Sequence, residues 1–202
     1  KRLGTDYLDV LLLHRPDALM EPEEVAEAFD ELEKSGKVRH FGVSNEDPYT
    51  MELLQSALHQ PICANQLQMS LTNATMIAQP MNTNICDGLN PVLDNGVLNY
   101  CRLHNITIQT WSPFQYGFFE GVFIGSEKYP KLNAKLDELA EKYNVTNTAI
   151  ALAWILRPPA KMQAVTGTIN PKRLRDCAAA LDITLAREDW YALYLAAGYR
   201  LP

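Results

Sequence analysis

Five short apolar runs in this sequence end in side chains that can form hydrogen bonds or stack on a flat ring. These ends are His14, Ser44-Asn45, Gln66, Trp111-Ser112 and Thr166-Gly167-Thr168. Together they offer an imidazole, amides, hydroxyls and an indole, and none of these groups carries a permanent charge. Amides can bond a carboxamide while an aromatic side chain stacks on the ring that bears it. The set predicts a site for a ligand such as nicotinamide.

Other chemistries lack the residues that they need at these positions. The strand ends hold no pair of carboxylates for glycoside hydrolysis, no His, Cys and Asp cluster at metal-ligand spacing, and no activated Ser or Cys nucleophile. We therefore expect no metal. An unrelated barrel hydrolase that uses His14 and Asp17 is a weaker alternative, because Asp17 follows Pro16 in a turn that it is suited to cap.

The end of the last apolar run adds an expected anion site. Residues 166–175 read TGTINPKRLR and lead from a strand into the start of a helix. Asn170 is suited to cap that helix, whose free N–H groups and dipole favour a phosphate. Lys172, Arg173 and Arg175 concentrate positive charge there in a chain of net charge −6. The alternative is a solvated basic helix start without a ligand.

Alternating strands and helices must position these groups. Buried strands are expected at residues 7–13, 38–43, 62–67, 106–111 and 162–166. Helices are expected at residues 22–35, 48–58, 91–104, 131–143, 147–157, 171–181 and 187–197. The polar segment 68–90 and the Gly- and aromatic-rich segment 113–130 are expected to be long loops.

Such alternation predicts an α/β fold with a parallel sheet. A doubly wound sheet would place a G-x-G-x-x-G turn after a strand, and the sequence has no such turn. A (β/α)₈ barrel would place polar residues at the strand ends, as observed. Five strands are too few to close a barrel, which typically needs about 250 residues. Residues 1–6 also read as the last turn of a helix, so we expect an incomplete barrel that forms one partial domain over residues 1–202.

The composition of the chain limits the classes of partner that we expect. The chain has 202 residues, of which 47% are hydrophobic and 21% are charged, as in a soluble globular protein. The acidic balance gives no support to nucleic-acid binding, and no apolar run is long enough to span a membrane. The four cysteines are widely spaced, which is typical of buried free thiols in a reducing compartment. We therefore expect a cytoplasmic protein.

Several motifs resemble the aldo-keto reductase family. They are LGTDYLDVLLLHRPD at residues 3–17, GKVRHFGVSN at 36–45, NQ at 65–66, WSP at 111–113 and TGTINPKRLRD at 166–176. Their order and spacing are similar to that family from its fourth strand to its C-terminus, and the branch that they resemble most is bacterial. The resemblance implies strands 4 to 8 of a TIM barrel with their helices, plus a C-terminal helix.

The resemblance also implies roles for single residues. His14 would orient the carbonyl of the substrate, and Trp111 would stack on the nicotinamide ring. The carboxamide would be held by Ser44, Asn45 and Gln66. The pyrophosphate would lie against Ser112 and Phe114, and the adenosine 2′-phosphate would bind Thr168, Asn170 and Arg173. The implied cofactor is NADPH, with segment 113–130 closing over it.

Some positions depart from the family pattern. Gly167 stands where a lysine often precedes the hydroxyl residue of the phosphate site, so NADPH preference rests mainly on Arg173. Asp176 and Cys177 replace residues that commonly meet the adenine. Leu67-Gln68 replaces a usual x-Glu on the substrate side.

The resemblance therefore implies an NADPH-dependent reductase of small-molecule aldehydes or ketones. The family's catalytic Asp, Tyr and Lys fall before residue 1, so we expect this chain alone to be inactive, as a fragment. An alternative is a regulatory or sensor protein that binds NADPH without turnover. Unpaired sheet edges would favour self-association. The sequence does not identify the substrate.

Overall fold

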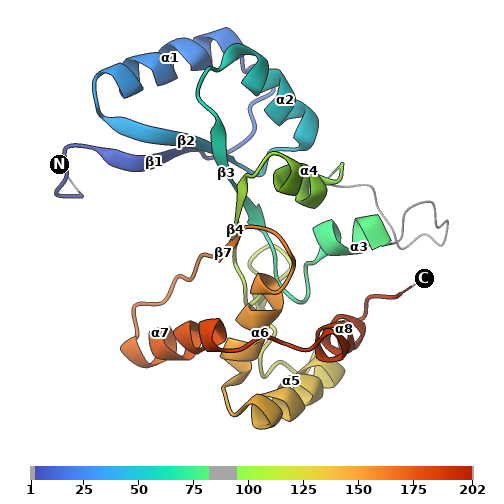
Figure 1. Ribbon diagram of the computed structural model, residues 1–202. Coiled ribbons are helices and arrows are strands. Elements are labelled where there is room, and N and C mark those ends of the chain that lie inside the picture. The colour runs from blue at the N-terminus through green and yellow to red at the C-terminus, as the bar shows by residue number, and fades with distance from the viewer. Residues whose placement is uncertain (1–2, 82–94, 202) are drawn as a thin grey trace. The chain divides into compact units, whose positions relative to one another are not determined.

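The computed structural model describes residues 3–81 and 95–201, as Figure 1 shows. The chain falls into two compact units. Unit 1 contains residues 3–67 and 95–109, and unit 2 contains residues 68–81 and 110–201. Strands β3 (Ile62–Gln68) and β4 (Thr107–Trp111) each begin in unit 1 and end in unit 2. The expectation of one domain over residues 1–202 stays a prediction.

Unit 1 is built on parallel strands. Strands β1 (Leu8–Leu13) and β2 (Val38–Ser44) pair in parallel, as do β2 and β3. In this register Leu13 lies opposite Val43, and Ser44 lies opposite Gln66. The carboxyl ends of these three strands therefore share one edge of the sheet.

Helices α1 (Pro22–Lys34), α2 (Pro48–Ala57) and α4 (Val97–Leu103) complete unit 1. Both α1 and α2 begin with proline, whose fixed φ suits the first helical turn. The Asp47 carboxylate caps α2 by accepting the Tyr49 amide at 2.8 Å. Phe29 of α1 stacks on Phe41 of β2 with ring centroids 4.0 Å apart, which holds α1 along the sheet (Figure 1).

Unit 2 packs helices around α6 (Asn147–Leu156), in which Ala149–Ile155 are all buried. Its other elements are α3 (Thr75–Met81), the hairpin of β5 (Gln115–Tyr116) and β6 (Gly121–Val122), α5 (Pro130–Tyr143), β7 (Met162–Ala164), α7 (Pro171–Ala178), a 3₁₀ turn at Ala179–Asp182, and α8 (Arg187–Ala196). Helix α6 contacts α5, β7 and α7. The apolar sequence of α6 predicted a helix that is buried on several sides, as observed.

The sheet order among the described strands is β1-β2-β3-β4-β7. Each strand lies beside the next sheet strand along the chain, without the reversal of strand order that defines a doubly wound sheet. Sequential order is the arrangement of a barrel. Strands β1 and β7 are the outermost described strands of this sheet, and self-association through them stays a prediction.

Most predicted elements lie where they were expected, but both expected loops contain regular structure, and segment 113–130 holds the hairpin of β5 and β6. Segment 68–90 was expected to be an extended loop, yet α3 occupies Thr75–Met81. A turn between Ser70 and Asn73, whose backbones exchange two hydrogen bonds, precedes α3. Several apolar side chains of this polar segment are buried, namely Met69, Leu71, Ala74, Met76 and Ile77. Residues 82–90 lie outside the described residues.

Two further expectations fall partly outside the described residues. The helix expected at 91–104 is seen as α4 from Val97, and residues 91–94 are not described. At the start of the chain, residues 1–2 are not described, and Gly4 adopts a positive φ of 67°.

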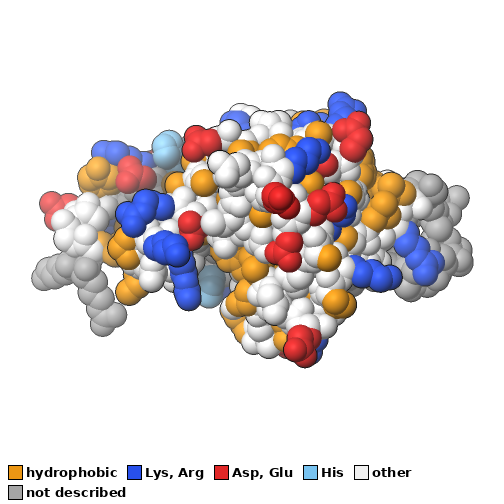
Figure 2. Space-filling model, turned by 90° about the horizontal axis from the view of Figure 1, so that it is seen from below, with side chains coloured by type: hydrophobic (Ala, Val, Ile, Leu, Met, Phe, Trp, Pro, Cys, Tyr) orange, Lys and Arg blue, Asp and Glu red, His pale blue; other side chains and the backbone are white. Residues whose placement is uncertain are grey.

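No described helix is both long enough and apolar enough to cross a membrane. On the face drawn in Figure 2, acidic and basic side chains are interspersed.

Candidate functional site

The carboxyl edge of the strands in unit 1 brings three predicted residues into register. His14 directly follows Leu13, whose partner Val43 precedes Ser44. Ser44 in turn lies opposite Gln66. The side chain of His14 is exposed. The edge therefore holds His14 directly after β1, Ser44 at the end of β2 and Gln66 near the end of β3.

Ser44, Asn45 and Gln66 form a hydrogen-bonded group. The backbone carbonyl of Gln66 accepts the Ser44 hydroxyl and the Asn45 amide N–H, both at 3.0 Å. The Ser44 Oγ also accepts the Asn45 side-chain amide at 2.9 Å. Asn45 has a φ of 59°, which turns the chain after β2. Ser44 is only 1% exposed, so it acts mainly as a support for its two neighbours.

Gln109 on β4 belongs to the same group and was not predicted. Its Oε1 accepts the Gln66 side-chain Nε2 at 3.1 Å. Thr107, Gln109 and Trp111 are half-buried and alternate with the fully buried Ile108 and Thr110. Gln109 and Trp111 therefore share a face of β4. The two-residue spacing from Trp111 indicates this shared face in the sequence, but it does not indicate the contact with Gln66.

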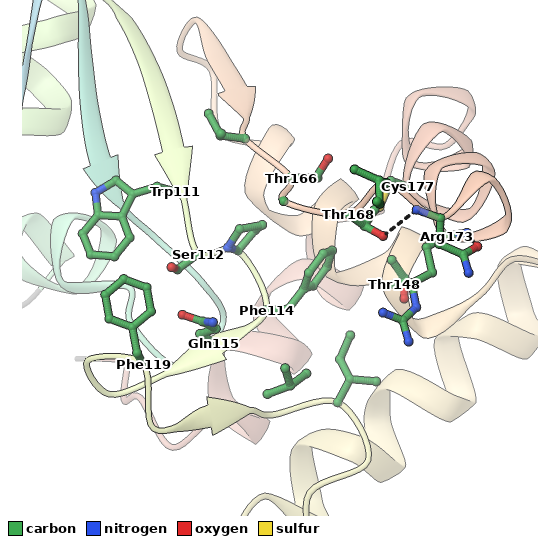
Figure 3. A pocket seen from close by; sticks show the side chains of 17 residues that line it. Trp111, Ser112, Phe114, Gln115, Phe119, Thr148, Thr166, Thr168, Arg173 and Cys177 are labelled. Atoms are coloured by element: carbon green, nitrogen blue, oxygen red, sulfur yellow. Dashed lines mark hydrogen bonds between the residues drawn. The ribbon is translucent and has the colours of Figure 1, made fainter. Parts of the chain in front are cut away.

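Unit 2 holds a cavity of about 970 Å³. Its wall comes from the end of β4 and the segment after it, the loop after β7, and α7. Lining residues that the sequence predicted are Trp111, Ser112, Phe114, Thr168, Asn170 and Arg173. Figure 3 shows Trp111 at one side of this pocket, with Thr168 and Arg173 at the opposite side.

The basic side of the pocket has the features of an anion site. Asn170 caps α7, and its Oδ1 accepts the backbone amides of Lys172 at 2.9 Å and Arg173 at 3.3 Å. The Thr168 hydroxyl oxygen accepts the Asn170 amide at 3.2 Å. Arg173 is exposed and has no carboxylate partner among the described residues. A guanidinium beside a helix N-terminus favours a phosphate group.

The opposite side of the pocket is aromatic. Trp111 stacks on Phe119, with ring centroids 5.9 Å apart and planes 23° from parallel. Phe118 meets Trp111 edge-on, with centroids 6.4 Å apart. Ser112 turns the chain after β4 with a φ of 53°, and its carbonyl accepts the Gln115 amide at 3.1 Å. These aromatic rings can accept a flat ligand.

Other residues of the pocket wall were not predicted, such as Gln115, Phe119 and Thr148. Thr148 lies at the start of α6, and it reaches the pocket only because α6 packs beside α7. Cys177 also lines the pocket, and burial with the Asp176 carboxylate raises the pKa of its thiol. It therefore lines the wall as a neutral group at pH 7.

The predicted site residues form two groups, each within one unit. Ser44, Asn45 and Gln66 are joined in unit 1, with His14 on the same sheet edge, and the other six line the pocket of unit 2. Within the described parts of the chain, no cluster of three or more His, Cys, Asp or Glu residues could hold a metal ion.

Comparison with known proteins gives a family match over most of the chain. The model of the Aldo/keto reductase family matches residues 1–194. A 6-dehydroglucose reductase of Agrobacterium fabrum is 38% identical over 196 residues, which are 96% of this chain and 59% of that protein. The oxidoreductase YdhF of Escherichia coli is 34% identical over 99% of this chain and 61% of its own length.

Solved structures agree with this match. The thermostable aldo-keto reductase Tm1743, in complex with the inhibitor epalrestat, has a TM-score of 0.75 and 27% identity over 96% of this chain and 62% of its own. An aldo-keto reductase from Klebsiella pneumoniae in complex with NADPH has a TM-score of 0.74 and 26% identity over 98% of this chain and 62% of its own. This chain thus spans about three fifths of the length of these relatives.

Proposed function

Because this chain belongs to the aldo-keto reductase family, we propose that it is part of an NADPH-dependent oxidoreductase that reduces an aldehyde or ketone to an alcohol. The NADPH in the Klebsiella pneumoniae structure supports the choice of cofactor. The observation that carries the proposal is Arg173 at the pocket wall, beside the capped start of α7, where no described carboxylate pairs with its guanidinium.

Each unit, taken by itself, has residues that fit a part of such a cofactor. In unit 2, Thr168, Asn170 and Arg173 would hold the 2′-phosphate, and Ser112 and Phe114 would meet the pyrophosphate. Trp111 would stack on the nicotinamide ring. In unit 1, the Gln66 Oε1 has no hydrogen-bond partner among the described residues and can accept an N–H of the carboxamide, beside Asn45 and Ser44.

The cofactor, when bound, would supply a hydride to the carbonyl carbon. His14 would orient the carbonyl by hydrogen-bonding its oxygen, since an exposed imidazole at the sheet edge can reach a ligand. The carbonyl oxygen also needs a proton to become an alcohol. In this sequence His14 is the only residue matched to the family's catalytic set, so we propose that the 202-residue chain binds NADPH without turning it over.

The cofactor assignment is tested by Arg173→Ala in the 202-residue chain. We expect the Kd for NADPH to rise by about 10- to 100-fold, because an ionic hydrogen bond to the phosphate is lost. The Kd for NADH, which has no 2′-phosphate, is expected to change by less than about twofold. Calorimetric titration of both cofactors measures these changes.

Arg175→Ala is the matched control, since Arg175 carries the same charge on the same helix and does not line the pocket. We expect it to leave both affinities nearly unchanged. Equal loss of NADPH and NADH binding in Arg173→Ala would contradict the phosphate assignment.

Turnover is tested separately by following NADPH absorbance with 4-nitrobenzaldehyde. A sugar-derived aldehyde is a second substrate, because the Agrobacterium fabrum relative is named a 6-dehydroglucose reductase. We expect no oxidation above that of the His14→Ala variant. Robust turnover that depends on His14 would show that the 202-residue chain is catalytically complete. Binding without turnover is also what a sensor protein would show, so the same assay on a chain extended at its N-terminus separates a reductase from a sensor.

A further inference from the structure

We infer that Gln109 is a positioning residue that orients the Gln66 side chain to accept the carboxamide of the cofactor. This inference rests on the proposed function, because it assumes that a nicotinamide lies at the strand edge of unit 1. Gln109 itself need not touch the cofactor. Its role is to decide which end of the Gln66 amide faces the ligand.

The backbone of Gln66 is already held in place. Its carbonyl accepts the Ser44 hydroxyl and the Asn45 amide, both at 3.0 Å, and β3 fixes its direction. What remains open is the rotation of its terminal amide. An amide presents a donor NH₂ at one end and an acceptor oxygen at the other, and a half-turn exchanges them.

One hydrogen bond to Gln109 fixes the rotation of the Gln66 terminal amide. Its Oε1 accepts the Gln66 Nε2 at 3.1 Å, so the donor end of Gln66 faces β4. The Gln66 Oε1 is left without a partner among the described residues. An unpaired acceptor suits the N–H of a carboxamide, whereas a rotated Gln66 would present a second donor to it. Gln109 therefore favours a ligand that donates at this point.

The test compares NADPH with its reduced 3-acetylpyridine analogue, in which a methyl ketone replaces the carboxamide and no N–H remains. In the 202-residue chain we expect Gln109→Leu to raise the Kd for NADPH by about 3- to 10-fold, the usual effect of one neutral hydrogen bond. The Kd for the analogue is expected to change by less than about twofold. Calorimetric titration measures both.

Two further variants separate positioning from structural damage. Gln109→Glu keeps an acceptor oxygen at the same reach and is expected to restore most of the NADPH affinity. Thr107→Val changes the same face of β4 without touching Gln66 and is the matched control, expected to leave both affinities unchanged. In the background of Gln66→Leu, the substitution Gln109→Leu is expected to have no further effect on NADPH binding.

The outcomes distinguish this inference from the proposed function. If the unsubstituted chain binds no NADPH, the proposed function fails and the inference fails with it. If the chain binds NADPH but Gln109→Leu weakens NADPH and the analogue equally, only the inference is overturned, and Gln109 is a structural residue of β4.

Discussion

Glu46 is a carboxylic acid that the fold buries beside the proposed carboxamide contacts. It directly follows Ser44-Asn45, and only 4% of its surface is exposed. Burial, with a smaller contribution from the Asp47 carboxylate, raises the pKa of Glu46 above its ordinary value. Its backbone carbonyl accepts the Asn65 amide at 2.8 Å, but its carboxyl group has no hydrogen-bond donor among the described residues. The Glu46 carboxyl group is therefore harder to ionise in the folded chain than in water.

We expect Glu46→Gln to raise the free energy of unfolding at pH 7 by up to about 1 kcal/mol, since it removes a partly desolvated charge. An acid whose pKa is raised by folding is protonated in both states at low pH, and its unfavourable contribution grows as pH rises through the unfolded and then the folded pKa. The increase in the free energy of unfolding caused by Glu46→Gln should therefore vanish at about pH 3. Urea unfolding at the two pH values measures it.

The neighbouring residue provides the control for this prediction. Asp47→Ala removes the cap of α2 and is expected to lower the free energy of unfolding at pH 7 by about 1 kcal/mol. A gain in Glu46→Gln of equal size at both pH values would show that packing, and not ionisation, is the cause.

Residues at strand ends could be predicted from the sequence, whereas Gln109 could not. Ser44, Asn45 and Gln66 each stand where an apolar run stops, and the parallel register brings such ends together. Gln109 lies inside a strand, 43 positions from its partner Gln66. Its role depends on which strands are neighbours and on which face it occupies. Glu46 was missed for the same reason, because its burial follows from tertiary packing.

At the scale of elements, two tryptophans join α6 to α8. The Trp154 indole N–H donates to the Trp190 carbonyl at 3.0 Å, and the Trp190 indole N–H donates to the Trp154 carbonyl at 2.9 Å. Their rings stack with centroids 4.9 Å apart and planes 6° from parallel. Both are buried. This reciprocal pair fixes α8 against the central helix of unit 2.

We expect Trp190→Phe to lower the free energy of unfolding by about 1–3 kcal/mol, because it removes one hydrogen bond and part of the stacked surface. Tyr191→Phe, on the same helix, is the control, because it keeps the ring and removes only an exposed hydroxyl. We expect it to change the free energy of unfolding by less than about 0.5 kcal/mol. Urea unfolding followed by circular dichroism measures both. A loss as large in Tyr191→Phe would mean that α8 tolerates no substitution, and that the tryptophan pair has no special role.

Elements with strong periodicity were predictable, and those defined by packing were not. Helix α6 is apolar on nearly all sides, which predicted a buried helix, and Trp190 and Tyr194 stood on the apolar face of α8. Helix α3 was missed because its seven residues lie in a polar segment and contain Pro80. Its stability comes from contacts such as that of the Ala74 amide, which donates to the Tyr199 hydroxyl at 2.6 Å.

At the scale of the whole molecule, the sequence predicts one domain over residues 1–202, and the described residues cluster into two compact units. Alternating strands and helices indicate a single sheet, but they do not show how densely its parts are packed. Strands β3 and β4 each begin in unit 1 and end in unit 2. Because β3 and β4 each supply residues to both units, we expect the chain to unfold in one cooperative step.

The positions of the tryptophans allow this expectation to be tested without substitution. All three, Trp111, Trp154 and Trp190, belong to unit 2, so tryptophan fluorescence reports on that unit alone. Far-ultraviolet circular dichroism reports on the helices of both units. In urea, the two signals are expected to give the same midpoint and the same dependence on urea concentration.

NADPH should raise both midpoints together, because a ligand of the folded state stabilises every part that unfolds with its site. A different outcome would show that unit 2 is a domain of its own. In that case the fluorescence and circular dichroism midpoints would differ, and NADPH would shift only the fluorescence midpoint.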